Sequence, residues 1–327
     1  MNTRKLRKQY IFEGDFKSCF DTLSHQFILN NLGNFPLKNL IKRWLEAGYL
    51  ENNIFYKTRT GTPQGGIISP LLANIALNGM EKALNIKYKP RKIKGKYYYV
   101  NTSKYVVIKY ADDFVVLCET LKDAEAVYGL LDDYLEERGL TLAQDKTRIT
   151  HIKEGFDFLG YNIRCYEGQD REKVLIKASK DSIKSFKTKA KDIISKCYPW
   201  NIEESIIKLN YLINGTGNYW KIGSNKRIFK QMDNYIYELW MRRIKRWYPN
   251  KPVEWRVKKH FKMSTHPGHN DKWTFTDPKT GLQVDKMVWI KINYHYPIKY
   301  KATPYDSEFD EYFNQRTNKT PFQCLYR

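Results

Sequence analysis

Two adjacent acids separate a pair of apolar runs in the first half of this chain, and no other feature restricts its fold as strongly. The runs are Tyr105–Lys109 and Phe114–Cys118, with Tyr110–Asp113 between them. Two short β-type runs around a tight connection predict a β-hairpin whose turn carries Asp112 and Asp113. Neighbouring carboxylates repel each other, and Mg²⁺ would relieve the repulsion because it prefers oxygen ligands. Two solvated turn acids are the alternative interpretation of the turn taken alone.

The segments around this hairpin predict a sheet covered by helices. A strand is expected at Tyr10–Phe12, and Ser24 is a predicted helix N-cap. Ser69 and Pro70 predict the start of a single helix that continues to Leu84. The basic, tyrosine-rich residues 86–104 show no clear period.

Thr120 and Asp123 resemble a capping box, and Gly139 is a plausible helix stop. The helix between them is expected to turn five side chains inward: Leu121, Ala124, Tyr128, Leu131 and Leu135. Short strands should follow over residues 140–165. The order strand, helix, hairpin, helix, strand is typical of an α+β sheet domain.

Positive charge is concentrated in one region of the second half. Residues 176–262 hold 21 Lys and Arg against 7 Asp and Glu, a net +14 of the +22 carried by all 327 residues. Apolar residues there recur at helical spacing, which predicts a basic all-α domain. We therefore expect a sheet domain over 1–170, a helical domain over 171–262 and an irregular extension over 263–327.

Such an excess of positive charge indicates a polyanionic partner, either nucleic acid or an anionic membrane surface. The longest apolar runs, such as Ile67–Leu72, are much shorter than the roughly 20 residues of a membrane-spanning helix. The five cysteines are scattered, and no apolar segment follows the basic N-terminus. We expect a reducing compartment, either bacterial cytoplasm or an organellar matrix, rather than secretion.

Asp15 follows the first predicted strand and is a candidate third acid. Beside the hairpin turn it would complete a two-metal site for phosphoryl transfer, in which the ions activate the attacking oxygen and stabilise the leaving one. Taken alone, Asp15 is better explained as an ordinary turn acid. The glycine-rich segment Thr60–Pro70 is neither a P-loop nor a dinucleotide fingerprint, but its glycines allow close approach of backbone to substrate.

Three segments occur in the order and spacing of reverse transcriptase motifs: Glu13–Asp21, Gly61–Pro70 and Tyr110–Asp113. Phe158–Tyr161 and Leu209–Trp220 follow them. Together they resemble the reverse transcriptase/maturases encoded by group II introns, over nearly the whole chain. The resemblance implies a right-hand polymerase palm, then a basic helical thumb/maturase domain. It also implies RNA-directed DNA polymerase activity, with intron RNA binding that assists splicing and mobility.

The same resemblance implies roles for single residues. Asp15, Asp112 and Asp113 would be the catalytic acids. Two Mg²⁺ ions are expected in the active state, held by Asp15, Asp112 and the backbone carbonyl of Phe16. Asp113 would be the weaker ligand.

The nucleotide pocket would include Phe16, Phe20, Gln64 and Lys146. Phe20 would lie under the incoming sugar and favour dNTPs over NTPs, while Lys146 would lie near the triphosphate or pyrophosphate. The primer end would be positioned by Phe158, Leu159 and Gly160.

Basic residues of the helical domain are candidate RNA contacts, because Lys and Arg neutralise phosphates and release counterions. A solvated helix face is the alternative for each of them. The candidates are Lys184, Lys187, Lys189, Lys191, Arg242, Arg243, Lys245 and Arg246. Five aromatic side chains there are expected to pack in the core rather than stack on bases: Tyr211, Tyr219, Trp220, Trp240 and Trp247.

The ends of the chain affect the predicted activity. Only about a dozen residues precede Asp15, whereas the family carries a fingers region there. The C-terminal segment resembles the stretch before an HNH endonuclease domain but has no Cys-x-x-Cys motif. The expected partners are intron RNA, an RNA/DNA duplex and dNTPs, with a protein supplying fingers in trans or a homodimer as further options. The alternative functions are an RNA-binding splicing maturase without polymerase activity and an inactive fragment.

Overall fold

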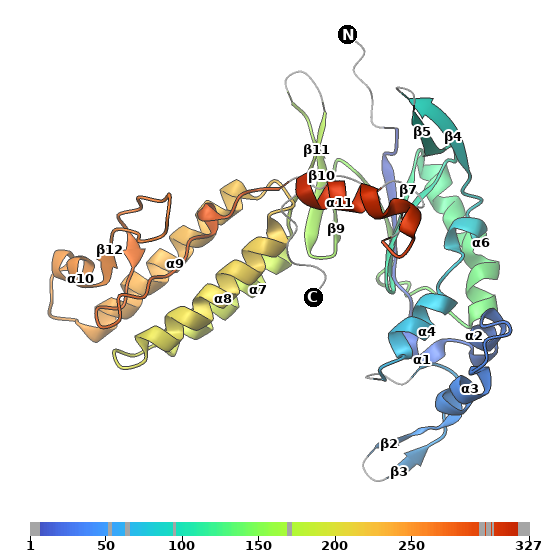
Figure 1. Cartoon of the computed structure of the whole chain (residues 1–327), viewed down its shortest axis with the longest axis horizontal. Coiled ribbons are helices and arrows are strands. Elements are labelled where there is room, and N and C mark those ends of the chain that lie inside the picture. The colour runs from blue at the N-terminus through green and yellow to red at the C-terminus, as the bar shows by residue number, and fades with distance from the viewer. Residues whose placement is uncertain are drawn as a thin grey trace. The chain divides into compact units, whose positions relative to one another are not determined.

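The computed structural model describes residues 7–51, 54–62, 66–93, 96–168, 172–293, 298, 302 and 304–319. The chain divides into two compact units (Figure 1). The first unit comprises Met1–Phe156 with Cys165–Glu172, and the second comprises Asp157–Arg164 with Lys173–Arg327. The first is a sheet with helices and the second is mainly helical, which confirms the predicted α+β class.

A four-stranded sheet forms the centre of the first unit. Its strands lie in the order β6-β7-β1-β8, and each neighbouring pair is antiparallel. Their bounds are Val106–Tyr110, Asp113–Cys118, Tyr10–Gly14 and Arg148–His151. The predicted hairpin is β6 and β7, and β1 lies between β7 and β8, so its Phe12 is fully buried.

Among its described residues, the first unit has six helices: α1 (Cys19–Thr22), α2 (His25–Asn31), α3 (Lys38–Glu46), α4 (Ser69–Ala76), α5 (Met80–Ala83) and α6 (Leu121–Arg138). The caps predicted at Ser24, Thr120 and Gly139 are confirmed, whereas Ser69 is not the N-cap of α4, because the helix begins at Ser69 and its N-cap is Ile68. The Ser24 hydroxyl accepts from the Phe27 N–H at 3.2 Å, and Thr120 accepts from the Asp123 N–H at 3.1 Å. Gly139 ends α6 with a φ of 68°.

The expectation of one continuous helix after Ser69 is wrong. The helix ends at Ala76, and Gly79, with a φ of 98°, precedes α5. Arg138 of α6 fills the interruption, because its guanidinium donates to the carbonyl oxygens of Ala76 and Asn78 at 2.8 and 2.9 Å. It also lies 3.8 Å from the centre of the Tyr134 ring. The carbonyl groups at the break are thus satisfied by a buried cation.

The inward face of α6 also differs from the prediction. Leu121 and Tyr128 are 45% and 41% exposed, whereas Val127 and Tyr134 are buried. The predicted Ala124, Leu131 and Leu135 are buried as expected. The buried face of α6 follows positions 124, 127, 131 and 134, which have the spacing of a helix. Leu121 is the first residue of the helix and lies at the end of this face.

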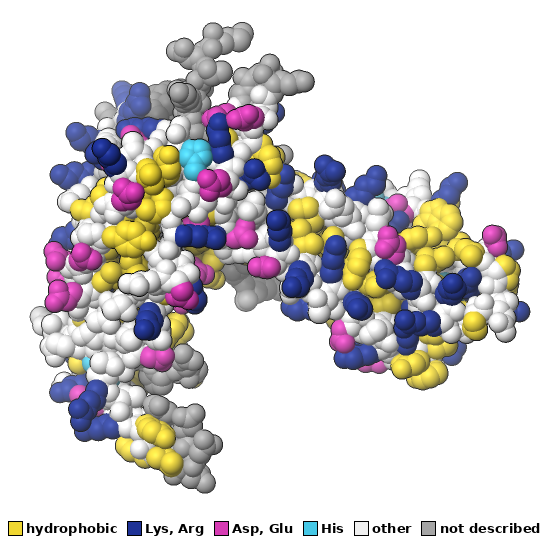
Figure 2. Space-filling view, turned by 180° about the vertical axis from the view of Figure 1, so that it is seen from behind, with side chains coloured by type: hydrophobic (Ala, Val, Ile, Leu, Met, Phe, Trp, Pro, Cys, Tyr) yellow, Lys and Arg dark blue, Asp and Glu magenta, His cyan; other side chains and the backbone are white. Residues whose placement is uncertain are grey.

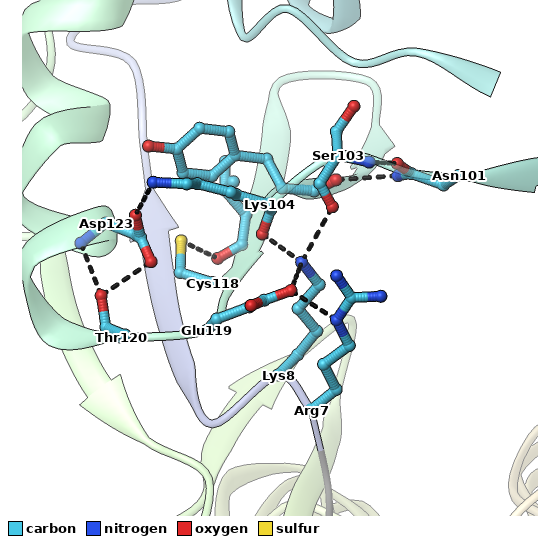
Figure 3. Close-up of polar contacts among 11 residues, drawn as sticks. Arg7, Lys8, Asn101, Ser103, Lys104, Cys118, Glu119, Thr120 and Asp123 are labelled. Carbon is cyan, nitrogen blue, oxygen red and sulfur yellow. Dashed lines mark hydrogen bonds and ion pairs between the residues drawn. The ribbon is translucent and has the colours of Figure 1, made fainter.

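A polar cluster secures the end of the hairpin opposite the acids (Figure 3). Lys8 donates to the carbonyl oxygens of Ser103 and Lys104 and to the Glu119 carboxylate. Arg7 pairs with Glu119 at 2.6 Å. Burial raises the pKa of Glu119, but hydrogen bonds and charges from Lys8 and Arg7 outweigh it and hold the pKa below its usual value. The cluster joins the start of β1 to both ends of the hairpin.

The chain also forms smaller sheets. They are the pairs β2 (Tyr49–Glu51) with β3 (Ile54–Tyr56) and β4 (Tyr88–Ile93) with β5 (Lys96–Asn101), and a sheet in the order β11-β10-β9. The last consists of β9 (Phe156–Phe158), β10 (Tyr161–Tyr166) and β11 (Lys173–Ala178). The patternless residues 86–104 therefore contain a β-hairpin.

The second unit is built on α7 (Lys180–Ser195), α8 (Ile202–Trp220), α9 (Lys226–Trp247) and α10 (Val253–His260). The first two lie side by side, and α9 also packs on α7 (Figure 1). The core includes Ile206, Leu209, Ile213, Phe229 and Trp240. The predicted helical region is confirmed. None of the described helices combines the length and apolar character needed to cross a membrane.

The first part of the segment after α10 packs on these helices. It contains β12 (Phe261–Lys262), β13 (Thr274–Phe275), η1 (Met287–Trp289), η2 (Ser307–Phe309) and α11 (Asp310–Lys319). Phe275 and Met287 belong to the same buried cluster as Trp240. Part of the expected irregular extension is therefore core of the second unit.

Candidate active site and nucleic-acid interface

Strand pairing brings the three candidate acids to one end of the central sheet. Gly14 of β1 pairs with Phe114 of β7. Asp15 directly follows Gly14, and Asp113 directly precedes Phe114, so the two acids lie at the same end of neighbouring strands. Asp112 occupies the hairpin turn beside them. We call these three residues the acidic edge.

The local backbone at the acidic edge is tightly constrained. Tyr110 pairs with Asp113, which leaves Ala111 and Asp112 as a two-residue loop. Ala111 has a φ of 53°, a left-handed conformation that disfavours residues with a Cβ atom. A Cβ atom added to Gly14 would lie 2.1 Å from Cζ of Phe114, so only glycine lets that buried ring pack across β1.

The charges of the acidic edge act on one another. The pKa of Asp113 is raised by burial, then by the charges of Asp112 and Asp15, while Lys146 lowers it. Burial, followed by the charges of Asp112 and Asp15, raises the pKa of the Cys19 thiol to about 12. Negative charge is therefore concentrated at this edge, which a bound cation would stabilise.

Lys146 lies against the acidic edge. Its Nζ is 2.9 Å from Oδ2 of Asp15, and the hydrogen bond and charge of Asp15 raise the lysine pKa. The backbone guides this contact, because the Ala143 N–H donates to the Asp15 carbonyl and the Lys146 N–H donates to that of Ala143. The predicted nucleotide ligand is thus paired with a predicted catalytic acid.

The backbone of Phe16 is oriented toward the neighbouring strand of the acidic edge. Phe16 forms an antiparallel bridge with Leu142, and the flanking bonds join Asp15 O to Ala143 N and Lys17 N to Thr141 O. Backbone groups of successive residues point to opposite sides of a strand. The carbonyl of Phe16 therefore points to the side on which β7 pairs with β1.

These residues fit a magnesium site without forming a complete one. Within the described residues, no three side chains of His, Cys, Asp or Glu are grouped closely enough to hold a metal ion together. Mg²⁺ commonly uses one or two carboxylates, with waters and substrate phosphates completing the shell. Asp15, Asp112 and the Phe16 carbonyl offer hard oxygen donors, and a cation would oppose the burial and the like charges that raise the pKa of Asp113.

The glycine-rich motif lies against the first motif. Gly61 donates its N–H to the Leu23 carbonyl at 2.7 Å, and Thr62 donates to that of Phe20 at 2.6 Å. Gly61 has a φ of 80°, and a Cβ atom there would be 2.5 Å from the Phe20 oxygen. The structure thus brings the predicted Phe20 beside this motif; Gln64 lies outside the described residues.

The predicted primer-positioning residues belong to the second unit. The Tyr219 hydroxyl donates to the Leu159 carbonyl at 2.7 Å, and the Ser182 hydroxyl donates to that of Gly160 at 2.9 Å. Leu159 and Gly160 both have positive φ, of 49° and 71°. Helices α7 and α8 therefore fix the turn that follows Phe158.

Four lysines of α7 line one groove of about 470 Å³ together with Tyr235 of α9. We call it the lysine groove, and its lysines are Lys180, Lys184, Lys187 and Lys191. Three were predicted RNA contacts, and the structure brings them together. Lys180 was missed, although its spacing from Lys184 places it on the same helix face. Lys and Arg side chains are spread along the second unit, at the right of Figure 2.

The basic residues of α9 have different surroundings. Arg242 pairs with Glu238 at 3.4 Å. The Nε of Arg243 donates to the Cys197 carbonyl at 2.6 Å, so this half-buried side chain is part of the fold. Lys245 and Arg246 are exposed, as is Lys189 of α7.

The aromatic side chains of the second unit divide into two groups. Trp220 and Trp240 are buried, as expected. Tyr211 and Tyr219 are 76% and 49% exposed, so the expectation of core packing is wrong for them. They lie on the solvent face of α8, where helical spacing alone gave the wrong assignment.

Two family models match the chain in sequence. Residues 1–163 match the model for reverse transcriptase (RNA-dependent DNA polymerase). Residues 183–261 match the model for the group II intron maturase-specific domain. The chain belongs to the group II intron reverse transcriptase/maturase family.

Curated relatives match this reverse transcriptase/maturase over part of their length. The chain is 31% identical to protein YkfC of Escherichia coli over 183 residues, covering 48% of this chain and 47% of that protein. It is 30% identical over 209 residues to the group II intron-encoded protein LtrA of Lactococcus lactis, covering 48% and 35%. The matched region thus spans about half or less of these relatives.

Among solved structures, telomerase from Candida albicans, in complex with a fragment of telomeric RNA, is similar to the reverse transcriptase/maturase chain. It is 14% identical with a TM-score of 0.40, covering 77% of this chain and 50% of that one. Apo telomerase from Candida tropicalis is 13% identical with the same TM-score, covering 78% and 49%. Similarity at this level is too low to assign shared contacts.

Proposed function

We propose that this chain carries out RNA-directed DNA synthesis by phosphoryl transfer at the acidic edge. The observation that supports it is the register of β1 and β7, which places Asp15 beside Asp113 with Asp112 in the adjoining turn. Burial and then the charges of Asp112 and Asp15 raise the pKa of Asp113, and this cost of negative charge is a reason for the edge to bind cations. The family supports the reaction, and the strand register supports the choice of these residues.

Asp15, Asp112 and the Phe16 carbonyl would hold two Mg²⁺ ions, which would activate the attacking hydroxyl and stabilise the leaving oxygen. Lys146 would exchange its ion pair with Asp15 for the phosphates of an incoming dNTP. Phe20 would lie under the sugar and exclude a 2′-hydroxyl, with Gln64 in the same pocket. Phe158, Leu159 and Gly160 would orient the primer end.

Primer extension on an RNA template tests this proposal. The variant Asp112→Asn keeps the shape of the side chain but removes the charge, so extension should fall by at least about 100-fold. Asp132→Asn, an exposed acid of α6, is the matched control and should extend like the unchanged protein. Equal extension by both variants would refute the assignment.

A second candidate function is a splicing maturase that binds intron RNA without copying it. The lysine groove favours it, since lysines on one helix face attract phosphates whether or not the palm is active. Such a chain would bind structured intron RNA but give no Asp112-dependent extension. These two functions imply the following partners: RNA, an RNA/DNA duplex, a protein that supplies fingers, and a second copy of the chain.

Salt dependence tests the lysine groove. Replacing Lys184, Lys187 and Lys191 with Gln should reduce the slope of log affinity against log salt by about 2 to 3. A control with the same charge change replaces Lys42, Lys82 and Lys122, three exposed lysines of the first unit. If both triple variants change the slope equally, binding is a general effect of net charge and not of the groove.

We further propose that the chain works in a reducing compartment that contains nucleic acid, such as bacterial cytoplasm or an organellar matrix. Its four described cysteines are buried and unpaired, and burial raises the thiol pKa of Cys118 and Cys197. Such thiols stay protonated and unreactive and form no stabilising disulfide.

A further inference from the structure

The loop between α7 and α8 carries two stacked aromatic rings at the surface. The ring centres of Tyr198 and Trp200 are 4.8 Å apart, and their planes differ by 6°. Trp200 is 75% exposed, which is unusual for an indole. Because Tyr198 covers only one of its faces, the opposite face is open to solvent. We call the two rings the aromatic platform.

The loop that bears the platform is held by several hydrogen bonds. The Asn201 side chain accepts from the Tyr198 N–H at 2.6 Å and donates to the Lys196 carbonyl at 3.4 Å. Cys197 is fully buried and its carbonyl accepts from Arg243. Proline at position 199 further restricts the backbone. The platform is therefore already ordered, and a ligand that stacks on it loses little entropy to loop ordering.

A cation lies close to the same rings. The guanidinium carbon of Arg243 is 4.8 Å from the centre of the Tyr198 ring. Its Nη2 atom is buried and has no hydrogen-bond partner within the described part of the chain. A cation, a phenol and an indole are thus gathered around this loop, and a planar ring could add to them on the open face of Trp200.

Charges nearby distinguish this surface from the lysine groove. Glu203 and Glu204 begin α8 just after the loop, and Glu204 pairs with Lys208. Two carboxylates disfavour a phosphate directly beside the indole. A neutral base is compatible with them, because base stacking needs no nearby cation.

From these observations we infer that the aromatic platform binds an unpaired nucleobase of RNA by stacking on Trp200. This inference rests on the proposed RNA binding and adds a component that recognises single-stranded or bulged nucleotides. Every base has a π face, so the site would tolerate different sequences while excluding paired helices. It would add affinity that hardly depends on salt, whereas the lysine groove supplies the salt-dependent part.

The test uses the full chain and two fluorescein-labelled RNAs, a hairpin with an all-adenosine loop and a blunt duplex with equally many phosphates. Trp200→Ala should weaken hairpin binding by about 5- to 100-fold, leave duplex binding unchanged and keep the salt slope. Trp200→Phe should retain most of the affinity. 2-Aminopurine in the loop should lose fluorescence on binding the unchanged protein and keep it with Trp200→Ala.

Tyr211→Ala is the matched control, since Tyr211 is 76% exposed on α8 of the same unit. Its loss should leave hairpin binding unchanged. Equal weakening on hairpin and duplex, or by both alanine variants, would overturn the inference. So would a change of molar mass with Trp200→Ala, because the platform would then be a protein contact. If the unchanged chain binds neither RNA, the proposed RNA binding is refuted as well. If the unchanged chain binds RNA and Trp200→Ala binds it equally well, only the aromatic platform is refuted.

Discussion

The acidic edge and the lysine groove collect charge in opposite ways. In the first unit, three carboxylates from two strands meet because Gly14 pairs with Phe114 and a two-residue turn follows Tyr110. In the second unit, four lysines meet because one helix repeats them every three or four residues. The first arrangement depends on tertiary pairing, and the second on local periodicity.

This difference predicts where each site is vulnerable. The acidic edge depends on backbone positions that carry no charge, namely Gly14 and Ala111. The lysine groove has no such dependence, because an exposed helix face tolerates single changes with little loss of stability. Substitutions beside the acidic edge should therefore disturb the fold, whereas those in the groove should alter binding alone.

The largest expected effect is that of Gly14→Ala. The new Cβ atom would meet the buried Phe114 ring at 2.1 Å, so unfolding free energy should fall by about 3 kcal/mol. Urea unfolding followed by circular dichroism measures it. Gly129→Ala on α6 is the control, since a Cβ atom there would lie 4.0 Å from Oδ2 of Asp132, and it should stabilise by about 0.5 to 1 kcal/mol. Equal stability of both variants would remove the backbone argument for the acidic edge.

A second prediction concerns His260, whose charge is excluded from the core of the second unit. The side chain is fully buried, and burial lowers its pKa to about 4, with the charge of Lys259 adding to the effect. Because the unfolded chain binds the proton more readily, stability should fall as pH drops from about 6.5 to 4, by about 2 to 3 kcal/mol. His260→Leu should abolish this contribution.

Tryptophan fluorescence is a suitable signal, because seven of the eight tryptophans lie in the second unit and only Trp44 lies in the first. Unfolding midpoints at several pH values would be compared between the two proteins. Parallel pH profiles would mean that His260 is not held neutral by its surroundings.

Asp233 should make stability depend on pH in the opposite direction from His260. Burial raises its pKa to about 6, although the N–H groups of Met287 and Val288 donate to its carboxylate. The folded state thus holds the proton more tightly than the unfolded state. The contribution of Asp233 to the free energy of unfolding therefore falls by about 2 kcal/mol as pH rises from about 3.8 to 6. In Asp233→Asn this slope should disappear while that of His260 remains. A pH profile unchanged by the substitution would contradict the assignment.

The smallest expected effect is that of Ala111→Gly in the hairpin turn. Glycine removes the left-handed strain but increases the freedom of the unfolded chain, which leaves a net gain of about 0.5 kcal/mol. Ala126→Gly, exposed on helix α6, should instead lose about 1 kcal/mol. Thermal melting distinguishes the two signs. A loss in both would show that the turn is not strained.

Much of the fold could be predicted because local signals dominate it. The apolar spacing of Ile206, Leu209 and Ile213 is enough to predict α8, and two apolar runs around Tyr110–Asp113 are enough for the hairpin. The break before Gly79 could not be predicted, because its carbonyl groups are satisfied by Arg138 from a distant helix. Local patterns do not contain such contacts.

The candidate site was predictable only in part. Asp112 and Asp113 are conspicuous in the sequence, but Asp15 gains its place from a strand pairing that only the family resemblance indicated. The contact between Lys146 and Asp15 depends on a turn after Leu142 and has no sequence signal. Trp200 could not be identified from the sequence, because its exposure distinguishes it and its spacing does not.

The guanidinium of Arg138 has a consequence for how the first unit can change. Two of its acceptors, the carbonyl groups of Ala76 and Asn78, are available because the chain stops being helical after Ala76. A variant that replaced Asn78 and Gly79 with strong helix formers would turn those carbonyl groups back into the helix and leave Nε and Nη2 of a buried cation without acceptors. The interruption and the arginine are therefore energetically coupled: closing the break removes two acceptors of Arg138, and removing the guanidinium takes a donor from each of the Ala76 and Asn78 carbonyl groups.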